Sequence, residues 1–106
     1  MSSRDAYVAI ADPTRREILT LLRDHKRLAA GEIAAHFRES SRPGISRHLR
    51  VLRECGVVDC VRQGKQQHYM VNPKPLTDIH NEFLAGFATM QVRSLKALRA
   101  TVERNA

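Results

Sequence analysis

The chain has 106 residues, of which 42% are hydrophobic, so it is large enough for one modest core and is predicted to form a single domain over residues 1–106. The formal net charge of +7 favours a polyanionic partner, and most of the excess lies in residues 41–68, which carry six basic and two acidic side chains. No apolar run approaches the length of a membrane span or a signal-peptide core, so we expect a cytoplasmic protein with no membrane partner.

Two helices are predicted to open the chain. An apolar patch within residues 7–10 predicts the first, over about residues 4–11. Asp12 is a natural N-cap and Pro13 a natural first helical residue, so the second should run from residue 13 to about residue 24. Its inward side chains should be Ile18, Leu21 and Leu22. Arg15 and Arg16 oppose the dipole of this helix, so local stability does not explain them; phosphate contact or simple solvent exposure would.

A third short helix, over about residues 30–37, and a polar turn at residues 38–40 precede the stretch 41–55. Ser41 is a good N-cap for that stretch, Pro43 is tolerated in a first turn, and Gly56 follows where a left-handed terminator is expected. These signals predict a helix-turn-helix in which residues 41–55 form the second helix.

The predicted second helix has an apolar stripe and a basic face. Ile45, Leu49 and Leu52 are spaced four and three residues apart, which places them on one side. The polar positions off this stripe are Arg42, Ser46, Arg47, Arg50 and Arg53. A solvated surface helix usually mixes both charge signs, whereas the one acid here is Glu54 near the end. We therefore predict a recognition helix that enters the major groove of DNA.

Two β-prone runs, residues 57–61 and 66–71, flank the glycine-containing turn 62–65 and predict a hairpin. A hairpin with Arg62 and Lys65 at its tip, directly after a helix-turn-helix, is typical of a wing that contacts phosphate or the minor groove, although hairpin tips are commonly polar in any case. The predicted fold class is mainly α with a small β-hairpin: a winged helix-turn-helix of about five helices and a two-stranded wing.

The end of the chain, about residues 75–105, is predicted to form one long helix because its apolar residues recur mostly every three or four positions. Some 30 residues at about 1.5 Å each would span ~45 Å, more than a domain of this size can cover, so a second subunit should cover part of it. The expected dimerisation residues are Tyr7, Ile79, Phe83, Phe87, Met90, Leu95 and Leu98.

Three segments carry a resemblance: residues 10–19 (IADPTRREIL), 31–34 (GEIA) and 41–58 (SRPGISRHLRVLRECGVV). Together with the wing they are similar to the ArsR/SmtB family of winged-helix transcriptional regulators, over roughly residues 5–75. The resemblance implies a homodimer, joined by its first and last helices, that usually represses a promoter until a metal or another signal lowers its affinity for DNA. Within the family the chain is most similar to the metal-independent branch that includes autorepressors of sporulation-delay type.

The resemblance also frames the metal question. Arsenic-type sensors carry a Cys-x-Cys pair where this chain has Ala34, Ala35 and His36, and zinc-type sensors complete an Asp-x-His pair with two further ligands on the last helix. Asp78 and His80 reproduce the pair, but the second half would fall at Gln91 and Ser94, which are poor zinc ligands. We therefore predict no metal and no cofactor, and DNA binding that is independent of metal.

Cys55 and Cys60 are the only thiols, and in a reducing cytosol such cysteines are usually small buried hydrophobes rather than a redox switch. No catalytic motif is present, so an enzyme is not predicted. The alternatives to a DNA-binding repressor are a winged-helix protein-interaction module and a metal- or redox-gated sensor; the small-molecule effector is unknown. The expected partners are double-stranded operator DNA and a second copy of the chain. The expected DNA-binding residues are Arg15, Arg16, Ser41, Arg42, Gly44, Ser46, Arg47, His48, Arg50, Arg62, Gln63 and Lys65.

Overall fold

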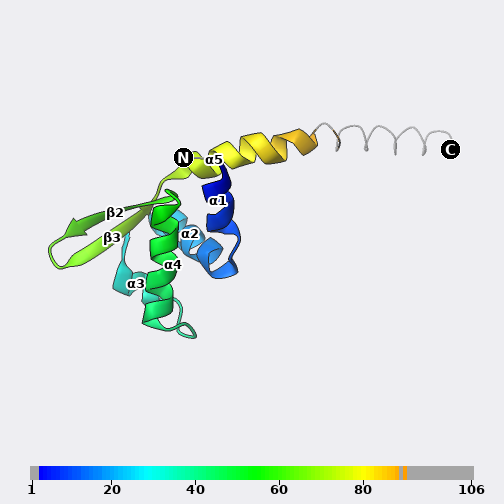
Figure 1. Ribbon diagram of the computed structural model, residues 1–106. Coiled ribbons are helices and arrows are strands. Elements are labelled where there is room, and N and C mark those ends of the chain that lie inside the picture. Colours follow the sequence, from blue (N-terminus) through cyan, green and yellow to red (C-terminus); the bar gives the residue numbers. More distant parts are fainter. Residues whose placement is uncertain (1–2, 89, 91–106) are drawn as a thin grey trace, which may run out of the picture.

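The computed structural model describes residues 3–88 and residue 90. Helices and a small antiparallel sheet alternate along the chain and form one winged helix-turn-helix, as the sequence predicts (Figure 1). The elements are α1 (Ser3–Ile10), α2 (Pro13–His25), β1 (Leu28–Ala29), α3 (Ala30–Ala35), α4 (Arg42–Glu54), β2 (Val58–Gln63), β3 (Gln66–Val71), α5 (Pro73–Ile79) and the π-helical turn η1 (His80–Leu84).

Local capping defines both ends of α4. The Ser41 hydroxyl accepts a hydrogen bond from the backbone N–H of Gly44 at 3.1 Å, and Pro43 lies in the first turn. At the other end Gly56 adopts a φ of 77°, and its N–H donates to the carbonyl of Arg53 at 3.0 Å. The N–H of Val57 reaches back to Leu52 at 3.2 Å, which completes a Schellman motif. The predicted bounds of this helix are therefore confirmed.

Asp12 is the N-cap of α2, as the sequence predicts. Its carboxylate accepts from the backbone N–H of Arg15 at 3.1 Å, and this hydrogen bond is the main reason that the pKa of Asp12 lies below its ordinary value. A carboxyl whose pKa is lower in the folded state stabilises the fold at neutral pH, and this contribution is lost as the pH falls through the folded-state pKa.

Replacing Asp12 with alanine should therefore lower the free energy of unfolding by about 1 kcal/mol at neutral pH. Urea unfolding measures the difference, which should shrink in acid as the wild-type carboxyl becomes protonated. Asp12→Asn is the matched control, because asparagine keeps a capping oxygen but cannot titrate. An alanine variant as stable as the wild type at neutral pH would contradict the capping role.

The core lies where α2, α3 and α4 meet beneath the base of the hairpin. Its largest fully buried side chains are Ile18, Leu22, Ile33, Ile45, Leu49, Leu52, Val57 and Val58. The apolar stripe predicted for α4 is thus entirely internal. In α2 one prediction is corrected: Leu19 is buried, whereas Leu21 is only half-buried at the edge of the core. The burial of α4 on one side leaves its opposite face to solvent.

The hairpin β2–β3 pairs from Val58 with Val71 to Gln63 with Gln66, so its loop consists of Gly64 and Lys65. Gly64 has a φ of 64°, which suits glycine at the first position of a tight hairpin loop. The sheet has one more strand than predicted: β1 pairs with β3, in the order β1-β3-β2, with Leu28 opposite Tyr69. This third strand ties the segment between α2 and α3 to the wing.

The C-terminal helix begins at Pro73, two residues earlier than predicted, and contains the π-helical turn η1 rather than regular α-helix throughout. It packs against α1, and beyond this contact it projects away from the domain on the side opposite the wing (Figure 1). Residues 91–106, which include the predicted positions Leu95 and Leu98, lie outside the described residues. Within the described part of the chain no helix is both long and apolar enough to cross a bilayer.

Candidate nucleic-acid interface

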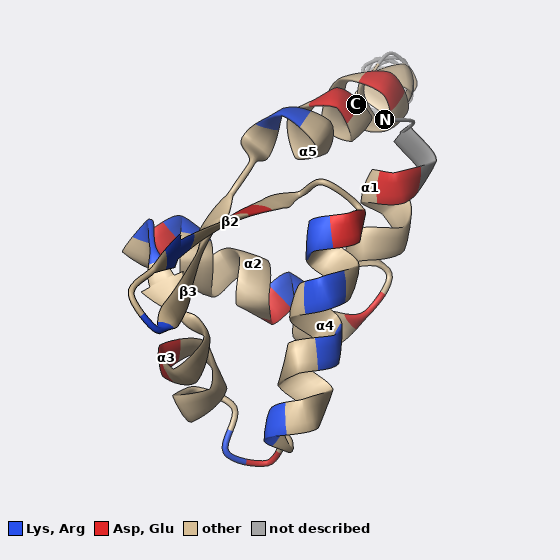
Figure 2. Ribbon diagram, turned by 60° about the vertical axis from the view of Figure 1, so that its left-hand side comes forward, with Lys and Arg blue, Asp and Glu red and all other residues tan. Residues whose placement is uncertain are grey.

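The outer face of α4 is basic along its whole length. Arg42, Arg47, Arg50 and Arg53 are all exposed, while the apolar residues between them are buried. In Figure 2, blue segments recur along the length of α4, and red appears only near its end. Because the opposite face is locked into the core, the helix can present these guanidinium groups to a partner without rearranging.

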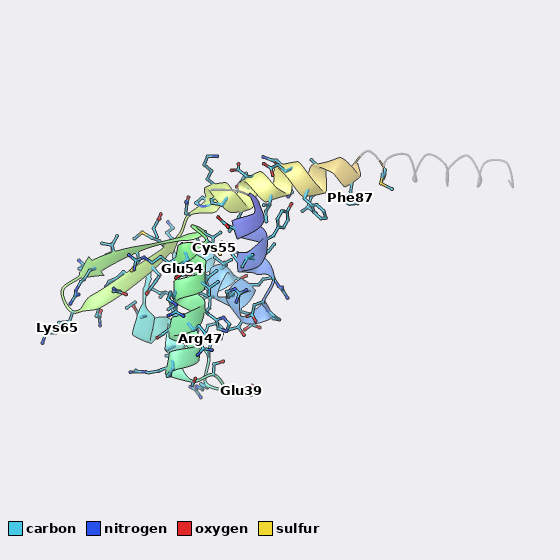
Figure 3. All side chains as sticks on the ribbon, viewed as in Figure 1. Glu39, Arg47, Glu54, Cys55, Lys65 and Phe87 are labelled. Atoms are coloured by element: carbon cyan, nitrogen blue, oxygen red, sulfur yellow. The ribbon has the colours of Figure 1, made fainter. Side chains whose placement is uncertain are left out.

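Two of these arginines have no competing partner. Arg42 and Arg47 make no hydrogen bond or ion pair with any residue that the structure describes, and Arg47 extends from the middle of α4 (Figure 3). Arg50 lies 4.0 Å from Glu54, with both side chains 69% exposed, and such a surface pair is worth little. The guanidinium groups of α4 are therefore available to phosphates and base edges.

The tip of the wing is also basic. Lys65 is exposed in the loop (Figure 3), and the Arg62 Nε donates to the Gly64 carbonyl at 3.3 Å. Gln63 accepts a hydrogen bond from Arg27 Nη2 at 2.8 Å, across the sheet from the end of α2. Arg27 was not among the predicted site residues, because a partner 36 positions away leaves no signal in local spacing. The structure thus adds a third cation to the wing surface, beside Gln63.

Arg15 and Arg16 have a structural role that the sequence analysis missed. Arg15 donates from Nε to the Ala9 carbonyl at 3.0 Å and from Nη2 to the Val8 carbonyl at 2.8 Å, and Arg16 Nη1 donates to Ile10 at 2.7 Å. These carbonyls belong to the last turn of α1, where intrahelical donors run out, and that of Val8 also accepts a turn hydrogen bond from the Ala11 N–H at 3.3 Å. The statement that local stability does not explain these arginines is therefore wrong: they oppose the dipole of α2 but cap α1. Their contact with phosphate stays a prediction.

Four other predicted site residues lie at the N-cap or in the first half of α4. Ser41 and Gly44 form the N-cap hydrogen bond, and a Cβ added at Gly44 would lie only 3.2 Å from the Ser41 hydroxyl oxygen. Ser46 is exposed on the outer face, one position before Arg47. His48 is only partly exposed, and its Nδ1 lies 3.5 Å from Arg15 Nη1 and 3.9 Å from Asp12 Oδ2. The N-cap and first half of α4 thus carry two serine hydroxyls: that of Ser41 caps the helix, and that of Ser46 lies on the outer face with Arg42 and Arg47.

Both cysteines are free thiols in the structure. Cys55 is buried at the end of α4, and burial raises the pKa of its thiol, which opposes thiolate formation. Cys60 is half-buried on β2, where its strand partner is Tyr69. Burial, with Cys60 as a second cause, raises the pKa of Tyr69. A buried, neutral Cys55 matches the predicted role of a small hydrophobe.

One of the two residues that could begin a metal site already pairs with a lysine. Asp78 pairs with Lys74 at 3.0 Å along α5, and the described residues contain no group of three or more potential ligands. Gln91 and Ser94 lie outside those residues. Metal independence therefore stays a prediction.

An apolar surface lies at the other end of the molecule, where α1 meets the C-terminal helix. The exposed fractions are 36% for Tyr7, 51% for Phe83, 52% for Phe87 and 62% for Met90. The ring of Phe83 contacts Tyr7 and Phe87 edge to face, with centroids 5.9 and 5.2 Å apart. Ile79 differs from the other predicted dimerisation residues that the structure describes, because it is already buried against the protomer core.

This surface surrounds a groove of about 410 Å³ whose lining is almost entirely apolar and includes Ile10, Leu76 and Leu84. Leu84 is 52% exposed and was not among the predicted residues, although it follows Phe83 directly in the sequence. Such a continuous exposed apolar surface is unusual for an isolated domain.

The fold and the basic face of α4 agree with three comparisons. The family described as "Bacterial regulatory protein, arsR family" matches residues 12–59. The transcriptional repressor SdpR of Bacillus subtilis is 41% identical over 80 residues, which cover 76% of this chain and 87% of SdpR. The chain belongs to the ArsR family. It is a DNA-binding transcriptional regulator, and its relatives are regulators rather than enzymes.

Other ArsR-family members support the same assignment. The arsenical resistance operon repressor of Escherichia coli is 39% identical over 67 residues, 63% of this chain and 56% of that protein. A solved structure described as a possible transcriptional regulator for arsenical resistance has a TM-score of 0.72 at 32% identity, over 88% of this chain and 95% of its own. The predicted family and the winged helix-turn-helix fold are both confirmed.

Proposed function

We propose that this ArsR-family chain acts as a homodimeric repressor that binds a palindromic operator through α4 and the wing. The observation that carries the proposal is the outer face of α4, where Arg42 and Arg47 have no partner among the described residues and Arg50 has only a weak one. Unpaired guanidinium groups on a rigid helix suit bidentate contacts with guanine edges and with phosphates.

The proposed contacts divide by role. Arg42, Ser46, Arg47 and Arg50 would face the major groove, whereas Arg62 and Lys65 would approach the flanking backbone or minor groove. Ser41, Gly44, His48 and Gln63 border these surfaces and belong to the proposed interface in a supporting role. A protein-interaction module is less well supported, because such a surface does not need arginines matched to phosphate along α4.

The proposed dimer rests on the apolar surface formed by Tyr7, Phe83, Phe87 and Met90. A second copy related by a two-fold axis would cover it on both protomers at once. The two copies of α4 would then meet half-sites about one helical turn of DNA apart, ~34 Å, or a multiple of that distance. The proposal of repression draws on the names of SdpR and the E. coli arsenical resistance operon repressor.

Selection from random DNA followed by fluorescence anisotropy at several salt concentrations tests this function. We expect an enriched imperfect palindrome, and log Kd should change with log salt by about 0.9 for each phosphate contact. A scrambled duplex of the same composition is the control. Binding that is no tighter to the selected duplex than to the scrambled one, or that ignores salt, would contradict sequence-specific recognition.

A further inference from the structure

The side chain of Arg15 lies where α1, α2 and α4 meet. It projects from the first turn of α2, and two of its nitrogens are committed to the carbonyls of Val8 and Ala9 at the end of α1. Its remaining nitrogen, Nη1, lies 3.5 Å from Nδ1 of His48 on α4. One guanidinium group therefore spans the helix that carries the proposed dimer surface and the helix that carries the proposed DNA surface.

This contact bears on the tautomer of a neutral His48 ring. A guanidinium nitrogen can only donate a hydrogen bond, so Nδ1 can accept from it only when the ring proton is on Nε2. The other charged group facing His48 is Asp12, whose Oδ2 lies 3.9 Å from the same Nδ1. That distance is too long for a hydrogen bond, and the Asp12 carboxylate is already the acceptor for the Arg15 backbone N–H.

We propose that Arg15 is a positioning residue for DNA binding: it holds His48 as the Nε2–H tautomer and thereby ties α4 to the end of α1. This inference rests on the proposed function. His48 lies next to Arg47 on α4 and its side chain is 26% exposed, so a fixed ring gives the DNA-facing helix one additional oriented N–H donor. A change in α1 on dimerisation would reach α4 through the same guanidinium group.

Arg16 supplies a matched comparison. It caps the same helix end, through the Ile10 carbonyl at 2.7 Å, and carries the same charge, but it is exposed and makes no hydrogen bond or ion pair with the described residues of α4. Arg15→Met and Arg16→Met each remove one cation and part of the α1 cap. Only Arg15→Met also removes the donor to His48.

The experiment measures operator affinity for both variants in the wild-type background and in a His48→Gln background. We expect Arg15→Met to weaken binding about tenfold in the wild-type background, and to have an effect close to that of Arg16→Met when His48 is glutamine. The slope of affinity against salt should stay as in the wild type for Arg15→Met, because no phosphate contact is lost. An equal effect of Arg15→Met in both backgrounds, or a slope reduced by about one unit, would overturn the inference in favour of direct phosphate contact.

A second readout needs no DNA. Nitrogen NMR shifts of the His48 ring in the free protein distinguish the two neutral tautomers, and we expect Nε2–H in the wild type and a mixture in Arg15→Met. A proton on Nδ1 in the wild type would overturn the inference even if the protein binds its operator. Failure of the wild type to bind any selected DNA would instead overturn the proposed function, and with it the role of Arg15 in binding. If Arg15→Met does not fold, Arg15→Lys serves the same test, because one ammonium cannot span both α1 carbonyls and His48.

Discussion

Replacing Arg47 with alanine should weaken operator binding by about 1–3 kcal/mol and relax discrimination at one base pair. Arg47 is exposed on α4 and has no partner among the described residues. Its removal should therefore change the stability of the free protein little, while the complex with DNA loses one contact. Arg50→Ala should behave similarly, because its pairing with Glu54 at 4.0 Å is weak. Anisotropy titrations against the operator and single-base variants measure both effects.

Arg23→Ala is the control for lost charge. Arg23 lies on α2 with a side chain 71% exposed, pairs with Asp24 at 3.0 Å and is not among the proposed DNA-contacting residues. Its removal should change operator affinity far less than the removal of Arg47.

Lys65→Ala in the wing should weaken binding to all DNA sequences alike and reduce the salt slope by about one unit. Unchanged binding by the Arg47→Ala, Arg50→Ala double variant would remove α4 as the recognition helix.

Introducing aspartate at Phe83 and Phe87 together should convert the dimer to a monomer. Both rings are about half exposed in the protomer, and a dimer that covers them would have to bury two carboxylates per chain without partners. Light scattering measures the mass, and operator affinity should fall sharply because each monomer reaches one half-site. Ile79 is unsuitable for this test, since it is buried in the protomer and its replacement would disturb the fold itself.

Val61→Asp is the matched control for the proposed dimer surface. Val61 is 45% exposed, like the phenylalanines, but it lies on β2 in the wing. Its replacement adds one negative charge per chain, against two in the double variant, at an exposed apolar position outside the proposed dimer surface and should leave the mass unchanged. A soluble Phe83→Asp, Phe87→Asp protein with the mass of a dimer would show that the subunits associate through another surface.

Residues close together in the chain were sufficient to determine most of the helix-turn-helix. Asp12 and Pro13 start α2 and Ser41 starts α4, because a capping oxygen needs only a backbone N–H three positions ahead. Gly56 ends α4 for an equally local reason, a positive φ that glycine adopts freely. The basic outer face of α4 also follows from spacing alone, since helical periodicity separates it from the buried stripe.

Tertiary packing decided the features that depend on distant partners. β1 is only two residues long and is a strand solely because β3 pairs with it, which no local pattern predicts. Likewise, Leu19 rather than Leu21 is buried because of how α2 is rotated against its neighbours. A positive charge at the start of a helix opposes the helix dipole, so the sequence alone gives no structural reason for Arg15. The reason is tertiary: the Arg15 guanidinium contacts carbonyls of α1 and the ring of His48. Short-range hydrogen bonds are encoded by neighbours in sequence, whereas burial and long side-chain contacts exist only once the helices have packed.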